Sequence, residues 1–159
     1  MLTAEIIFDY VWLHFVSVFP EARNLPVAYG AADPQARVAV PASALTFFEK
    51  KLAFPEEVFW LEWDEKNLPL FAPPAAAGLL HQTENQVTIG ADIIGAAFYF
   101  LSGWQEYYSQ VRDKFGRYPY RESLQFRHGF VTVPVVNYYF DILKTALEKG
   151  YGISLKNPE

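Results

Sequence analysis

The 159-residue chain has the length of one domain, and its content of 52% hydrophobic and 18% aromatic residues excludes a disordered protein. The absence of cysteine excludes disulfides and thiolate chemistry, and the net charge of −5 argues against nucleic acid as the main partner. The charge is uneven, because residues 1–91 hold 5 basic and 11 acidic residues whereas residues 92–159 hold 8 and 7. Such an apolar chain also favours a surface that a partner or neighbouring domain covers.

The first ninety residues predict one long helix followed by short strands. In residues 4–19, Ile7, Val11 and Phe15 recur every four positions, and Pro20 ends the helical pattern. Alternating or β-branched runs predict strands at 25–29, 36–41, 58–63 and 68–72, with a short helix at 43–51. Residues 78–90 form either a hairpin arm or a long loop. We predict an α+β fold, in which a small mixed sheet of four or five short strands is packed by three main helices. The alternative is a three-layer, doubly wound α/β arrangement, because strand and helix alternate early in the chain.

The second half of the chain predicts two helices. Asp92 stands at the N-cap of a helix over 92–109, where its carboxylate can accept an N–H of the first turn. Gly95 and Gly103 inside this helix each cost about 1 kcal/mol relative to alanine, which close approach of another backbone would explain. A second helix is expected over 134–149, with Gly150 as its stop. Residues 1–150 then form one globular domain, and residues 151–159 a linker or tail.

The sequence contains no recognisable targeting or membrane segment. The apolar N-terminus includes Glu5, Asp9 and His14 and lacks a basic leading region. The run IIGAAFYFL is far shorter than the roughly 20 residues of a membrane-spanning helix. We therefore expect a cytoplasmic protein that is not bound to a membrane.

Four charged residues at the end of the aromatic helix and after it form what we call the charged cluster: Glu106, Arg112, Asp113 and Arg117. Asp113 can begin a type I turn that ends at Gly116, and Glu106 can reach back to an arginine across this reversal. We favour a structural interpretation, in which these ion pairs fix the loop. In the functional alternative, the cluster is part of a small anion- or sugar-binding site. Arginines 112, 117 and 121 would then pair with charge, and Trp104, Tyr107, Tyr118 and Tyr120 would stack.

Signals for other chemistry are weak. His14, His81 and His128 are scattered, and the sequence contains neither a histidine pair with metal-ligand spacing nor a G-x-S-x-G motif. We therefore predict no catalytic residue, no metal site and no cofactor. The segment RYPYRESLQFRH mixes basic and aromatic residues as RNA-binding surfaces do, but Asp113 and Glu122 interrupt the five basic residues from Arg112 to Arg127 and the whole chain is acidic. We expect no nucleic-acid partner.

Three motifs, DIIGAAFYFLSGWQEY, RDKFGRYPYRESL and GFVTVPVVNYYFDIL, carry a family resemblance. Over residues 92–147 the chain resembles the uncharacterised N-terminal domain that precedes the catalytic domain in a group of bacterial polysaccharide-deacetylase-like proteins. The agreement over residues 1–91 is loose. The matching positions are Asp92, Trp104, Glu106, Tyr107, Asp113, Arg117, Ser123, Gly129, Pro134 and Asn137.

This resemblance implies an accessory domain of a longer protein of carbohydrate metabolism. The catalytic part of such proteins resembles a carbohydrate esterase barrel with T-x-D-x-D and H-x-x-x-H motifs, and neither motif occurs in this chain. The expected role is non-catalytic, either docking on the protein's own C-terminal catalytic domain or helping to hold a glycan. The alternatives are an independent small enzyme or ligand-binding domain that uses the charged cluster, and a plain interaction domain. The candidate binding or structural network is Asp92, Trp104, Glu106, Tyr107, Arg112, Asp113, Arg117 and Tyr118.

Overall fold

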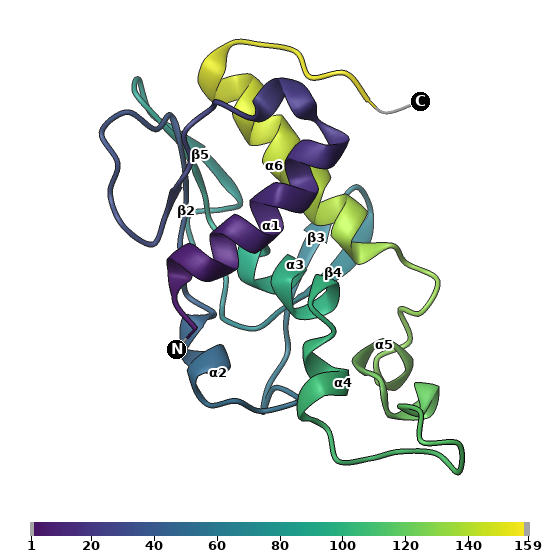
Figure 1. Ribbon diagram of the computed structural model, residues 1–159. Coiled ribbons are helices and arrows are strands. Elements are labelled where there is room, and N and C mark those ends of the chain that lie inside the picture. The colour runs from purple at the N-terminus through teal and green to yellow at the C-terminus, as the bar shows by residue number, and fades with distance from the viewer. Residues whose placement is uncertain (1, 158–159) are drawn as a thin grey trace.

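The computed structural model describes residues 2–157 of the chain (Figure 1). The α-helices are α1 (Ala4–Val18), α2 (Leu45–Glu49), α3 (Ile93–Leu101), α4 (Trp104–Tyr108), α5 (Leu124–Arg127) and α6 (Val135–Tyr151). The strands are β1 (Ala28–Tyr29), β2 (Val38–Val40), β3 (Phe59–Trp63), β4 (Lys66–Leu70), β5 (Leu80–Gln82) and β6 (Val87–Ile89). Single 3-10 turns, η1 (Pro20–Ala22) and η2 (Tyr120–Glu122), follow α1 and precede α5.

The strands form two sheets, and the predicted α+β class is confirmed. The larger sheet is mixed and has the order β1-β2-β6-β5, in which β1, β2 and β6 are parallel and β5 is antiparallel to β6. Strands β3 and β4 form a separate antiparallel hairpin. The predicted single sheet of up to five strands is therefore divided. Each predicted strand is present, although β1 is shorter than expected and β4 begins at Lys66, because the left-handed turn is made by Asp64 and Glu65 alone.

Three helices cover one face of the mixed sheet (Figure 1). Helix α3 packs between α1 and α6, α6 contacts β2 and β6, and α1 contacts β1. The predicted first and last helices are confirmed to within two residues at each end. None of the helices in residues 2–157 combines the length and the apolar character that crossing a bilayer requires.

The predicted helix over 92–109 is wrong in one respect, because it is interrupted. Helix α3 ends at Leu101, and α4 starts at Trp104 after Gly103, whose φ of 68° is left-handed. A Cβ atom at position 103 would meet no other atom within 4 Å, so close approach does not explain this glycine. Gly103 instead provides the backbone conformation that ends one helix and redirects the next.

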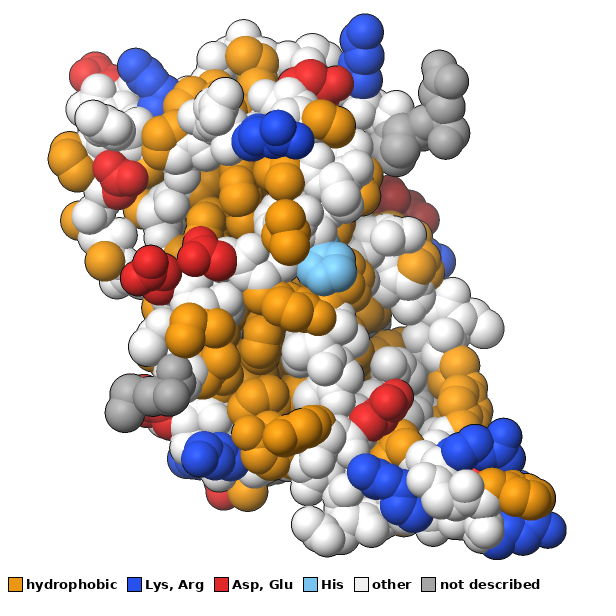
Figure 2. All heavy atoms as spheres, viewed as in Figure 1, with side chains coloured by type: hydrophobic (Ala, Val, Ile, Leu, Met, Phe, Trp, Pro, Cys, Tyr) orange, Lys and Arg blue, Asp and Glu red, His pale blue; other side chains and the backbone are white. Residues whose placement is uncertain are grey.

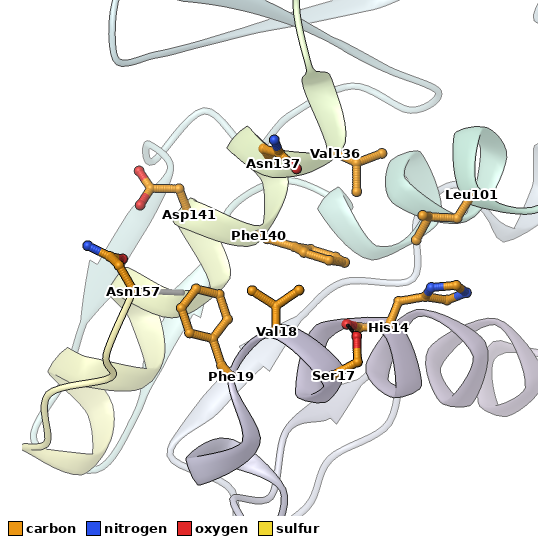
Figure 3. Close-up of a pocket in the computed structure, with 10 residues that line it drawn as sticks. All are labelled: His14, Ser17, Val18, Phe19, Leu101, Val136, Asn137, Phe140, Asp141 and Asn157. Carbon is orange, nitrogen blue, oxygen red and sulfur yellow. Dashed lines mark hydrogen bonds between the residues drawn. The ribbon is translucent and has the colours of Figure 1, made fainter. Parts of the chain in front are cut away.

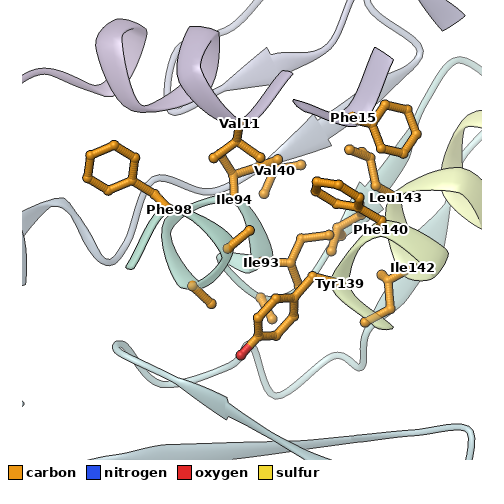
Figure 4. Packing of buried hydrophobic residues seen from close by; sticks show 14 of the residues in the cluster. Val11, Phe15, Val40, Ile93, Ile94, Phe98, Tyr139, Phe140, Ile142 and Leu143 are labelled. Atoms are coloured by element: carbon orange, nitrogen blue, oxygen red, sulfur yellow. The ribbon is translucent and has the colours of Figure 1, made fainter. Parts of the chain in front are cut away.

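The core lies where the three helices meet the sheet (Figure 4). Every fourth residue of α1 that the sequence assigned to the core is fully buried, namely Ile7, Val11 and Phe15. Phe15 packs edge-on against Phe140 of α6 with ring centroids 5.4 Å apart, so α1 and α6 are in direct contact. The other labelled core residues in Figure 4 are Val40, Ile93, Ile94, Phe98, Tyr139, Ile142 and Leu143.

Buried tyrosine and tryptophan side chains also attach the loops to this core. The Tyr99 hydroxyl donates to the carbonyl of Ala53 at 2.7 Å, and the Trp104 indole N–H donates to that of Leu52 at 2.6 Å. The hydroxyls of Tyr139 and Tyr151 donate in the same way to the carbonyls of Pro69 and Pro26. These residues therefore satisfy their own polar atoms and carbonyls of the segment after α2, of β4 and of the loop before β1.

The segment after the last predicted helix packs on the domain. Helix α6 continues to Tyr151, and Gly152, with a φ of 64°, provides the left-handed stop that the sequence analysis assigned to Gly150. Leu155 is 3% exposed, and its N–H donates to Glu148 Oε2 at 2.9 Å. Of the predicted linker or tail, residues 158 and 159 lie outside the described residues.

Candidate functional site

The side chain of Asp92 accepts hydrogen bonds from three separate parts of the fold. Its Oδ1 atom accepts the N–H of Gly95 at 2.7 Å, and its Oδ2 atom accepts the N–H of Ala44 at 2.9 Å. The Tyr29 hydroxyl donates to both oxygens, at 3.0 and 2.9 Å. Asp92 therefore joins β1, the residue before α2 and the first turn of α3, and its predicted N-cap position is confirmed.

Burial dominates the electrostatics of this group. It raises the pKa of Asp92 to about 6, whereas the hydrogen bonds from Gly95, Ala44 and Tyr29 act in the opposite direction. Burial also raises the pKa of the Tyr29 hydroxyl, and the neighbouring Asp92 charge raises it further, so Tyr29 remains a donor. Because structural donors occupy both carboxylate oxygens, Asp92 acts as an internal connector and presents no free atom to a ligand.

Gly95 allows this connection to be compact. A Cβ atom at position 95 would lie 2.8 Å from Asp92 Oδ2 and 2.9 Å from Ala44 Cβ, which is closer than packed atoms tolerate. The close approach expected at Gly95 is therefore present, although side-chain atoms make it and not another backbone. The glycine fits here because the segment before α2 crosses directly over the first turn of α3.

The aromatic helix contributes two buried side chains beside the charged cluster. Trp104 is 7% exposed and packs edge-on against Phe48 with ring centroids 4.9 Å apart, so it is not open for stacking. Gln105, which the sequence analysis did not single out, is equally buried. Its Oε1 atom accepts the N–H of Leu124 at 2.9 Å, and its Nε2 atom donates to Gln125 Oε1 at 2.9 Å. Gln105 thus fastens α4 to α5.

Arg112 of the charged cluster is held by backbone carbonyls and not by carboxylates. Its guanidinium donates to the carbonyls of Ser109, Val111 and Glu106 at 3.0, 2.6 and 2.9 Å. The carboxylate of Glu106 forms no ion pair within the described part of the chain. The expected Glu106–arginine pair is therefore wrong, although Arg112 does brace the loop that follows α4.

Asp113 builds the turn that the sequence predicted. Its Oδ1 atom accepts the N–H groups of Phe115 and Arg117 at 2.8 and 2.9 Å, and its carbonyl accepts the N–H of Gly116 at 3.0 Å. Arg117 Nε lies 3.4 Å from Asp113 Oδ2, with 72% of the arginine side chain exposed, so this ion pair contributes little to stability. The hydrogen bonds to the backbone, more than the charge, fix the turn.

The remaining aromatic candidates differ in how accessible they are. Tyr118 is half-buried, its hydroxyl donates to the carbonyl of Glu122 at 2.8 Å, and burial raises its pKa. Tyr107 is 79% exposed, and Phe115, which the sequence analysis passed over, is 68% exposed. The structure thus brings Glu106, Tyr107, Arg112, Asp113, Arg117 and Tyr118 together in one loop region, while Asp92 and Trp104 belong to the core.

An apolar groove lies between the end of α1 and the start of α6 (Figure 3). It encloses about 500 Å³. Figure 3 shows Val18 and Phe19 facing Val136 and Phe140 across the opening, with Leu101 towards one end and Asn157 towards the other. His14, Ser17, Asn137 and Asp141 complete the lining. The Asp141 carboxylate is already engaged, because it accepts the indole N–H of Trp63 at 2.8 Å.

Exposed hydrophobic side chains on α1 extend this groove. Ile6, Tyr10 and Leu13 are 49%, 38% and 69% exposed, and their spacing of four and three residues places them on one side of the helix. Figure 2 shows hydrophobic side chains gathered along the middle of the face on which α1 lies, with charged side chains around them. We call Ile6, Tyr10 and Leu13, together with the groove, the apolar face.

A second cavity of about 630 Å³ lies at the ends of the parallel strands, beneath the loop that connects β1 to β2. Small residues such as Gly30, Ala39 and Gly90 line most of it. Its polar groups hold the loop: Asp33 Oδ1 accepts the N–H of Gln35 at 2.9 Å, and Gln86 Nε2 donates to the carbonyl of Ala36 at 3.3 Å. Within residues 2–157, no three His, Cys, Asp or Glu side chains are arranged to hold a metal ion.

Comparison with protein families matches residues 2–152 to DUF7033, a family of unknown function. The chain belongs to this family. The match spans every helix and strand described above, so DUF7033 describes the whole α+β domain and not one motif within it. Neither the curated proteins nor the solved structures contain a match to this DUF7033 chain.

Proposed function

We propose that this domain is a non-catalytic accessory module that docks on a neighbouring domain of a longer protein through the apolar face. The observation that carries the proposal is the second hydrophobic side of α1. Ile7, Val11 and Phe15 are buried in the domain, yet Ile6 and Leu13 on the other side are 49% and 69% exposed. Tyr10 between them is 38% exposed, although its ring packs edge-on against Phe98 and its hydroxyl donates to the carbonyl of Leu101. A helix that is apolar on most of its circumference is typical of one covered on several sides.

The energetics favour covering this face. Complete burial of a large hydrophobic side chain stabilises a structure by about 1.5–3 kcal/mol relative to exposure, and Ile6 and Leu13 of α1 are still largely exposed. Glu5 and Asp9 are exposed on the same helix, so an occupant with basic residues around an apolar ridge would complement it. Contiguous apolar surface of this kind marks interaction sites.

A neighbouring domain in the same polypeptide would start close to the apolar face. Asn157 lines the groove, so a domain joined after residue 159 would be tethered beside the apolar face. Tethering converts docking into an intramolecular step with an effective concentration in the millimolar range for a short linker. Under this proposal a modest interface is sufficient.

The identity of the neighbour rests on the resemblance of residues 92–147 to domains that precede polysaccharide-deacetylase-like catalytic domains. The positions of that resemblance are largely structural here: Asp92 connects three segments, Asp113 builds a turn, and Ser123 caps α5 through its Oγ, which accepts the N–H of Phe126 at 3.1 Å. This supports an accessory role, in which bacterial carbohydrate-esterase chemistry would belong to the neighbour and the domain would contribute stability or glycan positioning. The reading frame beyond Glu159 is the first test, because T-x-D-x-D and H-x-x-x-H motifs are expected there.

Docking itself is tested with Leu13→Asp in the longer protein. We expect the parent protein to melt at a lower temperature and residues 6–18 to lose protection from hydrogen exchange, because a carboxylate would be buried in the interface. The matched control is Val111→Asp, since Val111 is 43% exposed and belongs to the segment after α4 and not to α1. Equal melting of the two variants, together with equal exchange of α1 in the parent and in the isolated domain, would contradict docking through this face.

A further inference from the structure

The segment from Glu106 to Arg127, which we call the basic arm, differs in charge from the rest of the chain. Five basic and three acidic residues give it a net charge of +2, whereas the whole chain carries −5 and the remaining residues therefore −7. Figure 1 shows this segment leaving α4, projecting away from the sheet and returning to α5, and Figure 2 shows Lys and Arg side chains gathered around a hydrophobic one at its end. A polyanion is thus attracted to the arm and repelled by the body of the domain.

Exposed rings occur along the whole length of the arm. Tyr107 at its start is 79% exposed, Phe115 at its turn 68%, and Tyr120 on its return 56%. Phe115 lies between two cations, with Lys114 Nζ at 5.2 Å and Arg117 Cζ at 4.9 Å from the ring centroid. Phe115 and Tyr120 therefore have basic side chains beside them in space or in sequence, and none of the three rings is part of the core.

The arm also presents its cations in a fixed backbone. The Asp113 carboxylate and the pairing of Asp113 N–H with the Arg117 carbonyl at 2.7 Å close the turn, and Arg112 fastens its base. Two cations are available to a ligand, because the side chains of Lys114 and Arg121 form no hydrogen bond or ion pair with the residues that the structure describes. Because the turn is already formed, it loses little conformational entropy when it binds a ligand.

We propose that the basic arm binds an anionic polysaccharide. Lys114, Arg117 and Arg121 would pair with carboxylate or sulfate groups, and the rings of Tyr107, Phe115 and Tyr120 would stack on sugar rings. The exposed rings lie at the start, the turn and the return of the arm (Figure 1), so a polymer that follows the arm reaches all three, whereas a membrane would engage the tip alone. The net charge of −7 on the rest of the domain favours a polyanion with sparser charge than duplex nucleic acid, which has one charge per roughly 1.7 Å, and a carboxylated polysaccharide meets this condition. This inference goes beyond docking and does not depend on the apolar face.

The test measures binding of the complete chain to heparin, which carries sulfates, and to hyaluronate, which carries only carboxylates, with neutral dextran as a third probe. We expect binding to at least one of the anionic polymers and none to dextran. Affinity should fall when NaCl is raised from about 0.05 to about 0.3 M, because exposed charges are screened. Lys114→Ala/Arg121→Ala should weaken binding about tenfold, as expected for two exposed charge pairs, and Phe115→Ala should weaken it without altering the melting temperature.

The matched control is Lys50→Ala/Lys156→Ala, which removes the same charge from two exposed positions outside the arm and should leave binding unchanged. Single-stranded oligothymidine and phosphatidylserine vesicles are measured in parallel. The proposal is overturned by failure to bind either polysaccharide at low salt, by equal losses in the arm and control variants, or by tighter binding to the oligonucleotide or vesicles. The Leu13→Asp variant should bind the polysaccharide normally, so failure of the docking proposal and failure of this one are distinguishable.

Discussion

Single hydrogen-bonding groups in the interior hold distant segments of this domain together. Asp92 satisfies the N–H groups of Ala44 and Gly95 and the hydroxyl of Tyr29, and each of these donors would cost about 1–3 kcal/mol if left unpaired. The N-cap role of Asp92 could be predicted, because Gly95 is only three residues away. The contacts with Ala44 and Tyr29 could not, since no local pattern connects residues 48 and 63 positions apart.

Removing the Asp92 carboxylate should therefore destabilise the domain strongly. We expect Asp92→Ala to lower the free energy of unfolding by about 3–5 kcal/mol, because three buried donors lose their acceptor, and Tyr29→Phe to lower it by about 1–2 kcal/mol. Urea denaturation measures both, and Asp9→Ala on the exposed side of α1 is the control. A loss below about 1 kcal/mol for Asp92→Ala would show that water replaces the carboxylate.

The pKa of Asp92, raised by burial to about 6, predicts a pH dependence of a definite sign. The folded state holds the proton up to a higher pH than the unfolded state, so the carboxyl stabilises the fold fully below about pH 4. This contribution is lost as the pH rises through about 6, and it amounts to at most about 3 kcal/mol. The free energy of unfolding of the wild type minus that of Asp92→Asn should therefore fall between about pH 4 and 6 and be constant above 7. A difference that increases with pH would contradict the raised pKa.

At the scale of elements, glycines decide where helices end and how closely they pack. Hydrophobic spacing was sufficient to predict α1 and α6, because it follows from the helix period itself. It could not show that Gly103 interrupts the aromatic helix or that α6 stops at Gly152, since both depend on a positive φ. The spacing also could not show the role of Gly150, which lies within α6 and allows this helix to pack closely against the start of β2.

Gly150→Ala should destabilise the domain, although glycine to alanine inside a helix ordinarily stabilises it by about 1 kcal/mol. The new Cβ would lie 2.7 Å from the Arg37 carbonyl oxygen, which cannot move freely because it accepts the N–H of Val87 at 2.8 Å. We expect a loss of about 1–3 kcal/mol, as in overpacked cores. The neighbouring exposed substitution Lys149→Ala should stay within about 0.5 kcal/mol of wild type in the same urea titration. A stabilised Gly150→Ala would show that the helix and strand separate easily.

At the scale of the molecule, the fold class could be predicted from the sequence, but the long-range hydrogen bonds that attach loops and strand β4 to the core could not. Tyr99, Trp104 and Tyr139 reach carbonyls 46, 52 and 70 positions away, and such contacts have no sequence signature. The partners of the charged cluster could not be predicted either. Arg112 is held by backbone carbonyls, and because every residue has a carbonyl, the sequence does not show which ones an arginine will bind. The sequence indicated which segment would be braced, and only the structure shows which atoms do it.

The folded domain extends beyond residue 152, where the family match ends. Leu155 is buried against α6 and its N–H is bound by Glu148, so the segment after Gly152 is part of the folded unit. A chain truncated after Gly152 should lose about 2–3 kcal/mol of unfolding free energy, the cost of deleting a buried leucine. A chain truncated after Asn157 should match the complete chain, and Leu155→Ala should account for most of the difference between the two. Unchanged urea midpoints in both truncated chains and in Leu155→Ala would instead support the linker that the sequence predicted for 151–159. A neighbouring domain would then be tethered from Gly152 and not from the rim of the groove.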